Sequence, residues 1–95
     1  TFGFEIDHVQ IAIPEGGEDR ARSFFGDLLK LDELSKPAGL EARGGCWFAV
    51  ADRQIHLGVD QNFRAAQKAH VALSTISLDE LRARLERAGY HTQND

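Results

Sequence analysis

Long apolar segments and cysteine pairs are both missing from this chain of 95 residues. Its longest apolar run lies within residues 46–51, whereas a helix needs about 20 apolar residues to cross a bilayer. A single cysteine, Cys46, cannot form an internal disulfide, so the fold does not depend on an oxidising compartment. We therefore expect a cytoplasmic protein with no membrane partner, in which Cys46, inside an apolar stretch, is a buried and inert thiol.

An excess of basic residues is also lacking. The chain has 11 Lys and Arg against 15 Asp and Glu, a formal net charge of −4. Its arginines alternate with acids, as in Glu18-Asp19-Arg20, whereas binding to nucleic-acid phosphates requires a clustered basic surface. The sequence therefore indicates no nucleic-acid partner.

What remains is an ordinary globular composition, with 42% hydrophobic and 27% charged residues. Alternating patterns predict strands over residues 4–13, 46–50, 53–59 and 70–76, with a weaker strand over 31–35. Apolar residues at helical spacing predict a helix over 18–30. A second helix over 77–88 would begin at a capping box formed by Ser77 and Glu80 and end at Gly89. Residues 90–92 resemble the start of another strand.

The two halves of the chain resemble each other at an offset of 62 residues. His8-Val9 aligns with His70-Val71, and Arg20-Ala21-Arg22 aligns with Arg82-Ala83-Arg84. Such short identities also arise by chance, but the order of elements recurs as well, which favours a duplicated unit. We predict one α+β domain over residues 1–95. It would contain a β-α-β-β-β module over about 4–59, a polar connection over 60–69 and a partial second module over 70–95.

Histidines occupy the polar phase of three predicted strands. If the apolar phase packs against the helices, then His8, His56 and His70 share the opposite face of the sheet. Imidazole binds Zn, Fe, Mn, Ni or Co, so these three side chains are candidate ligands of a divalent metal ion. The alternative is that they are simply solvated, which is the usual state of polar residues on an exposed strand face.

The motif order resembles the vicinal oxygen chelate superfamily, which includes glyoxalase I, extradiol dioxygenases, fosfomycin-resistance enzymes and bleomycin-resistance proteins. The similar segments are Asp7-His8-Val9-Gln10-Ile11-Ala12-Ile13-Pro14, Arg43-Gly44-Gly45-Cys46-Trp47-Phe48, Ile55-His56-Leu57-Gly58-Val59 and Lys68-Ala69-His70-Val71-Ala72. The resemblance implies paired βαβββ modules in a curved mixed sheet with helices on its outer face, the second module being incomplete here. It also implies that His8 and His70 bind the metal, with His56 as a further ligand. A carboxylate ligand expected in the second module would fall beyond Asp95.

Two functions follow from this resemblance. The first is a metal-dependent glyoxalase or dioxygenase-type enzyme, acting as a homodimer on a small oxygen-rich substrate that chelates the metal. Gln10, Trp47 and Phe63 are the candidate substrate-binding residues, although Trp47 also suits the core and Phe63 the connection. No catalytic acid or base is identified. The second function is metal-free sequestration of a small molecule or antibiotic, as in bleomycin-resistance proteins. A diverged domain with only a structural or regulatory role is a third possibility.

Overall fold

The computed structural model describes residues 2–94. The chain divides into two compact units, residues 1–65 and 66–95. The division falls inside the predicted polar connection over 60–69.

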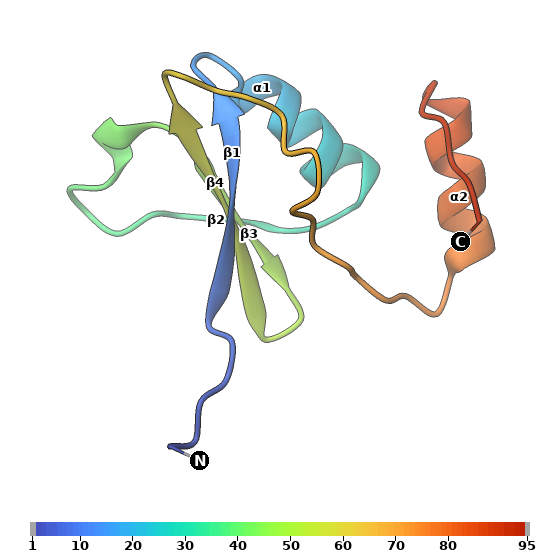
Figure 1. Ribbon diagram of the computed structural model, residues 1–95, viewed down its shortest axis with the longest axis horizontal. Helices are drawn as coiled ribbons and strands as arrows, with labels where there is room; N and C mark the ends of the chain where they lie inside the picture. Colours follow the sequence, from blue (N-terminus) through green and yellow to red (C-terminus); the bar gives the residue numbers. More distant parts are fainter. Residues whose placement is uncertain (1, 95) are drawn as a thin grey trace. The chain divides into compact units, whose positions relative to one another are not determined.

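The first unit contains a mixed sheet with the strand order β1-β4-β3-β2 (Figure 1). Its strands are β1 (His8–Pro14), β2 (Glu33–Leu34), β3 (Cys46–Val50) and β4 (Arg53–Asp60). β1 runs parallel to β4, and the other pairs are antiparallel. The predicted α+β class is confirmed, and the elements of this unit follow one another along the chain in the predicted β-α-β-β-β order. The first strand begins at His8 rather than at residue 4, because His8 pairs with Gln54 near the start of β4 and earlier residues have no strand opposite them.

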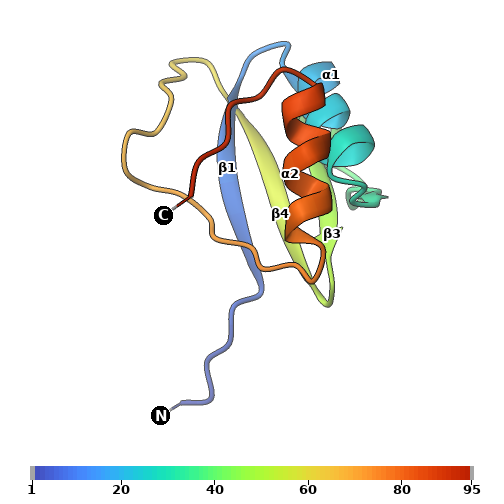
Figure 2. The same cartoon turned by 90° about the vertical axis from the view of Figure 1, so that its right-hand side faces the viewer.

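One helical segment connects β1 to β2, as predicted. It begins as α1 (Glu18–Ala21) and continues as the π-helical segment η1 (Arg22–Leu28). The wider winding is visible at its end, where the Leu29 N–H donates to the Phe24 carbonyl, five residues earlier, at 2.9 Å. The segment lies on one face of the sheet (Figures 1 and 2). On that face, the ring centroids of Phe25 and Phe48 are 5.8 Å apart.

The hydrophobic core lies between this helical segment and the sheet. It consists of the apolar phase of the strands together with one helical alanine: Ile13, Ala21, Cys46, Phe48, Ile55 and Leu57. Cys46 is 1% exposed, and burial raises the pKa of its thiol, in agreement with the inert role predicted for it. The polar phase of the same strands, which carries His8 and His56, therefore faces away from the helix.

The loop that leads into β3 is fixed at its last residues. It contains the short helix η2 (Glu41–Arg43) and ends at Gly45, whose φ is +80°. A Cβ atom at Gly45 would lie 2.1 Å from the carbonyl oxygen of Leu57, so no other residue fits without a backbone shift. The Gly45 N–H also donates to Glu18 Oε2 at 2.8 Å, which ties this loop to the start of α1.

The second unit contains the helix α2 (Leu78–Arg87), as predicted. Gly89 follows it with φ +94°, and its N–H donates to the Glu86 carbonyl at 3.0 Å, as expected for a glycine at a helix C-terminus. The predicted capping box is wrong, because Ser77 makes no side-chain capping bond. Its backbone N–H, which Glu80 was expected to bind, donates to Thr75 Oγ1 instead at 3.1 Å.

The predicted strand over 70–76 is not formed, and neither is the start of a strand over 90–92. A strand exists only when a neighbour completes its hydrogen bonds, and the described part of this unit provides none. The apolar side chains of the predicted strand are accordingly exposed, with Leu73 at 53% and Ile76 at 104%. Within residues 2–94, no helix combines the length and apolar character required to cross a membrane.

Candidate metal and substrate site

Three neighbouring strands place polar and aromatic side chains in one row on the face turned away from the helix. Gln10 in β1 pairs with His56 in β4, and His56 pairs with Trp47 in β3. His8 belongs to the same phase of β1. The structure thus brings together four of the residues selected from the sequence as site candidates.

The aromatic rings on this face form a continuous stack. The centroids of Trp47 and His56 are 3.8 Å apart with the rings inclined by 2°, and those of His56 and His8 are 4.0 Å apart with an inclination of 16°. His56 is therefore enclosed between two rings, and only 6% of it is exposed.

The surroundings of His56 favour the neutral form of its ring. Its Nε2 lies 2.8 Å from Gln54 Oε1, an oxygen that accepts the Nε2 proton. The pKa of His56 is lowered mainly by burial and further by the nearby His8, while the carboxylate of Asp7 partly opposes both effects.

His8 carries its proton on the other ring nitrogen. Its Nδ1 lies 2.8 Å from Asp7 Oδ2, and this hydrogen bond is the main cause of the lowered pKa of Asp7. Because Nδ1 donates to the carboxylate, the lone pair of the neutral ring is on Nε2, and the ring is 42% exposed. A carboxylate that orients a histidine in this way is the usual second partner of a metal-binding imidazole.

His70, in the second unit, has the same tautomer. Its Nδ1 lies 2.8 Å from the Lys68 carbonyl oxygen, so the Nε2 lone pair is again available. His8 and His70 both fit a metal ion in tautomer and accessibility. Within the described residues of either unit, no three His, Cys, Asp or Glu side chains gather closely enough to hold one.

The stacked rings of His8 and His56 do not suit a shared ion. An imidazole nitrogen binds a metal about 2.1 Å away, in the plane of its ring. An ion at that distance from both nitrogens would lie well outside both ring planes, because the rings face each other at 4.0 Å. In this arrangement, one ion therefore cannot bind both rings.

A pocket of about 210 Å³ adjoins the row of side chains. Gln10 and Trp47 contribute to it from the sheet, and Gly58 makes room there, since a Cβ at Gly58 would lie 2.8 Å from Gln10 Nε2. The full lining is Gln10, Lys36, Leu40, Arg43, Gly44, Trp47, Leu57, Gly58 and Val59. Two of these residues are cationic and none is acidic.

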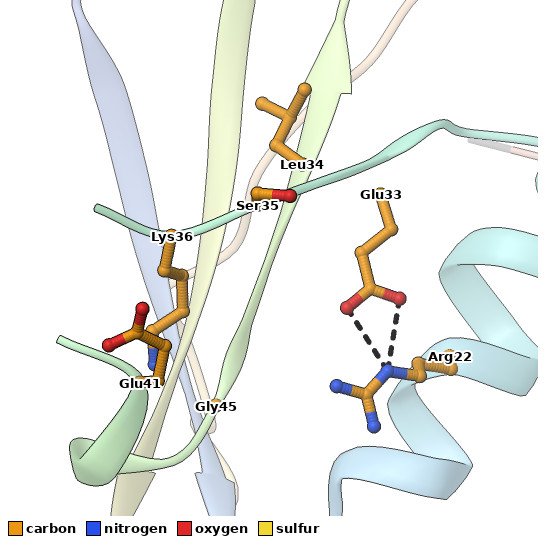
Figure 3. Close-up of a pocket in the computed structure, with 7 residues that line it drawn as sticks. All are labelled: Arg22, Glu33, Leu34, Ser35, Lys36, Glu41 and Gly45. Atoms are coloured by element: carbon orange, nitrogen blue, oxygen red, sulfur yellow. Dashed lines mark hydrogen bonds and ion pairs between the residues drawn. The ribbon is translucent and has the colours of Figure 1, made fainter. Parts of the chain in front are cut away.

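A second hollow of about 400 Å³ lies beside β2 (Figure 3). Arg22 and Lys36 contribute positive charges to it, and Glu33 and Glu41 contribute negative ones. Arg22 Nε donates to both carboxylate oxygens of Glu33, at 3.0 and 3.1 Å, as the dashed lines in Figure 3 show. The charges that line this hollow are therefore balanced, and none of the histidines lines it.

Phe63 does not line either pocket and is 37% exposed in the connection after β4. Sequence reasoning missed Asp7, Lys36 and Arg43 as site residues. Asp7 was detectable in principle, because a carboxylate directly before a candidate histidine is a possible second partner. Lys36 and Arg43 could not be identified from the sequence, because their position beside the pocket depends on the path of a loop.

Neither a scan of protein-family models nor a search of curated proteins finds a match to the chain. Solved structures do match. A glyoxalase family protein from Bacillus anthracis is 43% identical with a TM-score of 0.88, and the match covers 94% of this chain and 73% of that one.

More distant structures share the fold. The fosfomycin resistance protein FosX from Listeria monocytogenes, in a variant bound to Mn(II) and 1S,2S-dihydroxypropylphosphonic acid, is 14% identical with a TM-score of 0.71. That match covers 95% of this chain and 71% of FosX. Lactoylglutathione lyase from Agrobacterium tumefaciens is 18% identical with a TM-score of 0.56, covering 90% of this chain and 72% of that enzyme. With the identity to the Bacillus anthracis protein, the fold and the motif order establish that this chain belongs to the glyoxalase family of the vicinal oxygen chelate superfamily.

Proposed function

We propose that the protein is a divalent-metal-dependent enzyme of the glyoxalase type, in which His8 and His70 are metal ligands. The observation that carries this proposal is the matched state of the two rings. In each, Nδ1 donates a hydrogen bond at 2.8 Å, which leaves the lone pair of Nε2 available. The Mn(II) bound to FosX, a protein of the same fold, supports a metal role.

A bound divalent ion would supply Lewis acidity toward two neighbouring oxygens of a small substrate. The chain's own residues would orient the metal ligand and bind the substrate. Asp7 keeps the proton of His8 on Nδ1, and His56 holds the His8 ring by stacking on it. The Gln10 amide would hydrogen-bond the substrate, and Trp47 would provide an apolar wall beside it.

Metal analysis tests the ligand assignment. The full-length protein, purified without a histidine tag, is expected to contain near-stoichiometric metal by mass spectrometry. His8→Ala and His70→Ala are each expected to remove it, because two ligands lost singly leave an incomplete site. His91→Ala is the matched control, since His91 is exposed and has no role in the site.

Metal that persists in both variants would refute the assignment. A protein that contains no metal yet binds a flat aromatic ligand tightly would instead be a sequestering protein like those that confer bleomycin resistance. We also propose that the enzyme acts as a cytoplasmic homodimer, which light scattering coupled to size exclusion and cell fractionation can test.

A further inference from the structure

The pocket beside the histidine face carries a local positive charge in an acidic protein. Lys36 and Arg43 both line it, while no Asp or Glu does, and the whole chain has a formal net charge of −4. Two cations facing one cavity repel each other unless an anion lies between them or solvent screens them. Lys36 also lies close enough to Glu18 for its charge to lower the pKa of that carboxyl, so Arg43 is the less compensated of the two cations and the group that an incoming anion would meet.

The guanidinium of Arg43 is available for a ligand. Within residues 2–94, its side chain makes no hydrogen bond or ion pair. Lys36 Nζ donates to the carbonyl oxygen of Gly44, which uses one of its three donors and leaves two. The acid nearest to Arg43 in the sequence, Glu41, accepts the N–H of Gly39 at 2.9 Å and lines the second hollow together with Lys36.

The end of the loop that carries Arg43 is anchored before any ligand arrives. Gly45 packs against the Leu57 carbonyl so closely that a Cβ would lie 2.1 Å from it, and Glu18 accepts the Gly45 N–H. This anchor fixes the backbone two residues after Arg43, so less freedom of the main chain is lost when an anion binds there.

The pocket also has apolar lining residues. They include Leu40, Trp47 and Val59, and the amide of Gln10 adds a neutral hydrogen-bonding group to the lining. Trp47 also stacks on His56, so the pocket and the histidine face share one side chain.

We infer that this pocket binds the oxyanion group of a small organic anion, with Arg43 and Lys36 holding the charge and Trp47 covering the apolar part. This inference rests on the proposed function, because it describes the substrate of the same site. It assigns the substrate class as a carboxylate or phosphonate with a short apolar body rather than a neutral carbonyl compound.

Trp47 is the only tryptophan in the chain, so its fluorescence reports directly on the pocket. We would titrate the metal-free full-length protein, prepared with EDTA, with propylphosphonate, butyrate and neutral butanamide. Both anions are expected to bind at least about tenfold more tightly than butanamide, since hydrogen bonds to charged groups are about twice as strong as neutral ones.

Arg43→Gln is expected to weaken binding of both anions by about tenfold or more, while Arg43→Lys recovers part of the loss. Arg20→Gln, which removes an exposed arginine of α1, is the matched control and leaves binding unchanged. Tighter binding of the phosphonate than of butyrate would identify a dianion as the preferred group.

Equal binding of butanamide and butyrate would overturn the inference, as would an unchanged affinity in Arg43→Gln. Amide–proton NMR spectra establish that each variant is folded. Because the titrations use metal-free protein, their failure leaves the metal assignment intact. Conversely, if His8→Ala and His70→Ala keep their metal, the metal assignment fails, but the titrations still decide whether the pocket binds anions.

Discussion

The indole of Trp47 and the imidazole of His56 lie parallel, with their centroids 3.8 Å apart and their planes 2° from each other. His8 stacks on the other side of His56 at 4.0 Å. The stack links Trp47, which lines the pocket beside the sheet, to the candidate metal ligand His8 through the buried ring of His56. A change in the middle ring therefore affects both ends.

Replacing His56 by Ala is expected to lower the free energy of unfolding by about 2–3 kcal/mol. The substitution removes a buried ring and its hydrogen bond to Gln54. His56→Phe keeps a ring in the stack and is expected to cost about 1 kcal/mol, the value of the lost hydrogen bond. Urea unfolding measures both.

Metal content separates the two roles of His56. If His56→Ala remains folded and keeps its metal, His56 supports His8. If it loses metal as completely as His8→Ala does, His56 is itself a ligand, and the stacked arrangement must open when the ion binds.

The Gly45→Ala variant is expected to lose more than about 3 kcal/mol of stability. Its Cβ would overlap the Leu57 carbonyl, and its φ of +80° disfavours any residue with a side chain. Gly39→Ala is the control in the same loop: its φ is also positive, at +92°, but a Cβ there meets no atom within 4 Å. It is expected to cost about 1 kcal/mol. Equal losses in the two variants would show that close contact plays no part.

The carboxylate of Glu18 is expected to make stability depend on acid pH. Its pKa is lowered mainly by the hydrogen bond from the Gly45 N–H, below the ordinary value of 4.5. Above about pH 4.5 this contact stabilises the fold fully, and the contribution is lost as the pH falls through the lowered pKa. Glu18→Gln keeps an acceptor oxygen but cannot titrate. Denaturant midpoints between pH 6 and 3 should therefore fall less steeply in this variant than in the wild type, and parallel curves would contradict the assignment.

Adding a methyl group at Gly58 is expected to change binding more than stability. The Cβ of Gly58→Ala would lie 2.8 Å from Gln10 Nε2, the flexible end of a side chain that can move aside. Unfolding should change by less than about 1 kcal/mol. The displaced amide is expected to weaken binding of propylphosphonate by a few fold in the Trp47 titration. A variant with large destabilisation would mean that Gln10 is not free to move.

The thiol of Cys46 is expected to remain unreactive toward Ellman's reagent at pH 8 in the folded protein. Burial both hides it and raises its pKa above 9.0, so little thiolate is present. In denaturant it should react as fast as an exposed thiol does. Rapid reaction without denaturant would place the thiol at an accessible site.

Several parts of the fold followed directly from the sequence. The alternation of Ile55, Leu57 and Val59 predicted both β4 and the face that packs against the helix, because a strand with one buried face must alternate. The predicted strands over 46–50 and 53–59 left only two residues between them, which requires a tight turn, and Ala51 adopts the positive φ of +53° found in such turns. These features depend on neighbours in the chain.

Other parts depended on contacts between distant residues and could not be read in the same way. The segment over 70–76 has the pattern of a strand, but pairing requires a partner that pattern alone does not provide. The stack of His8, His56 and Trp47 follows from the register of three strands, and the approach of Lys36 and Arg43 follows from the loop. The sequence placed His8 and His56 on one face without revealing that their rings touch.

The close fit of Gly45 against Leu57 has a consequence for engineering. It fixes the point where the loop rejoins the sheet, while residues 37–43, which precede that point in the chain, are mostly exposed. This stretch can therefore be exchanged as a cassette, with new lengths and charges, while the join at Gly45 and the framework strands are left untouched. Selectivity for different small molecules would then be tunable from a single short insert.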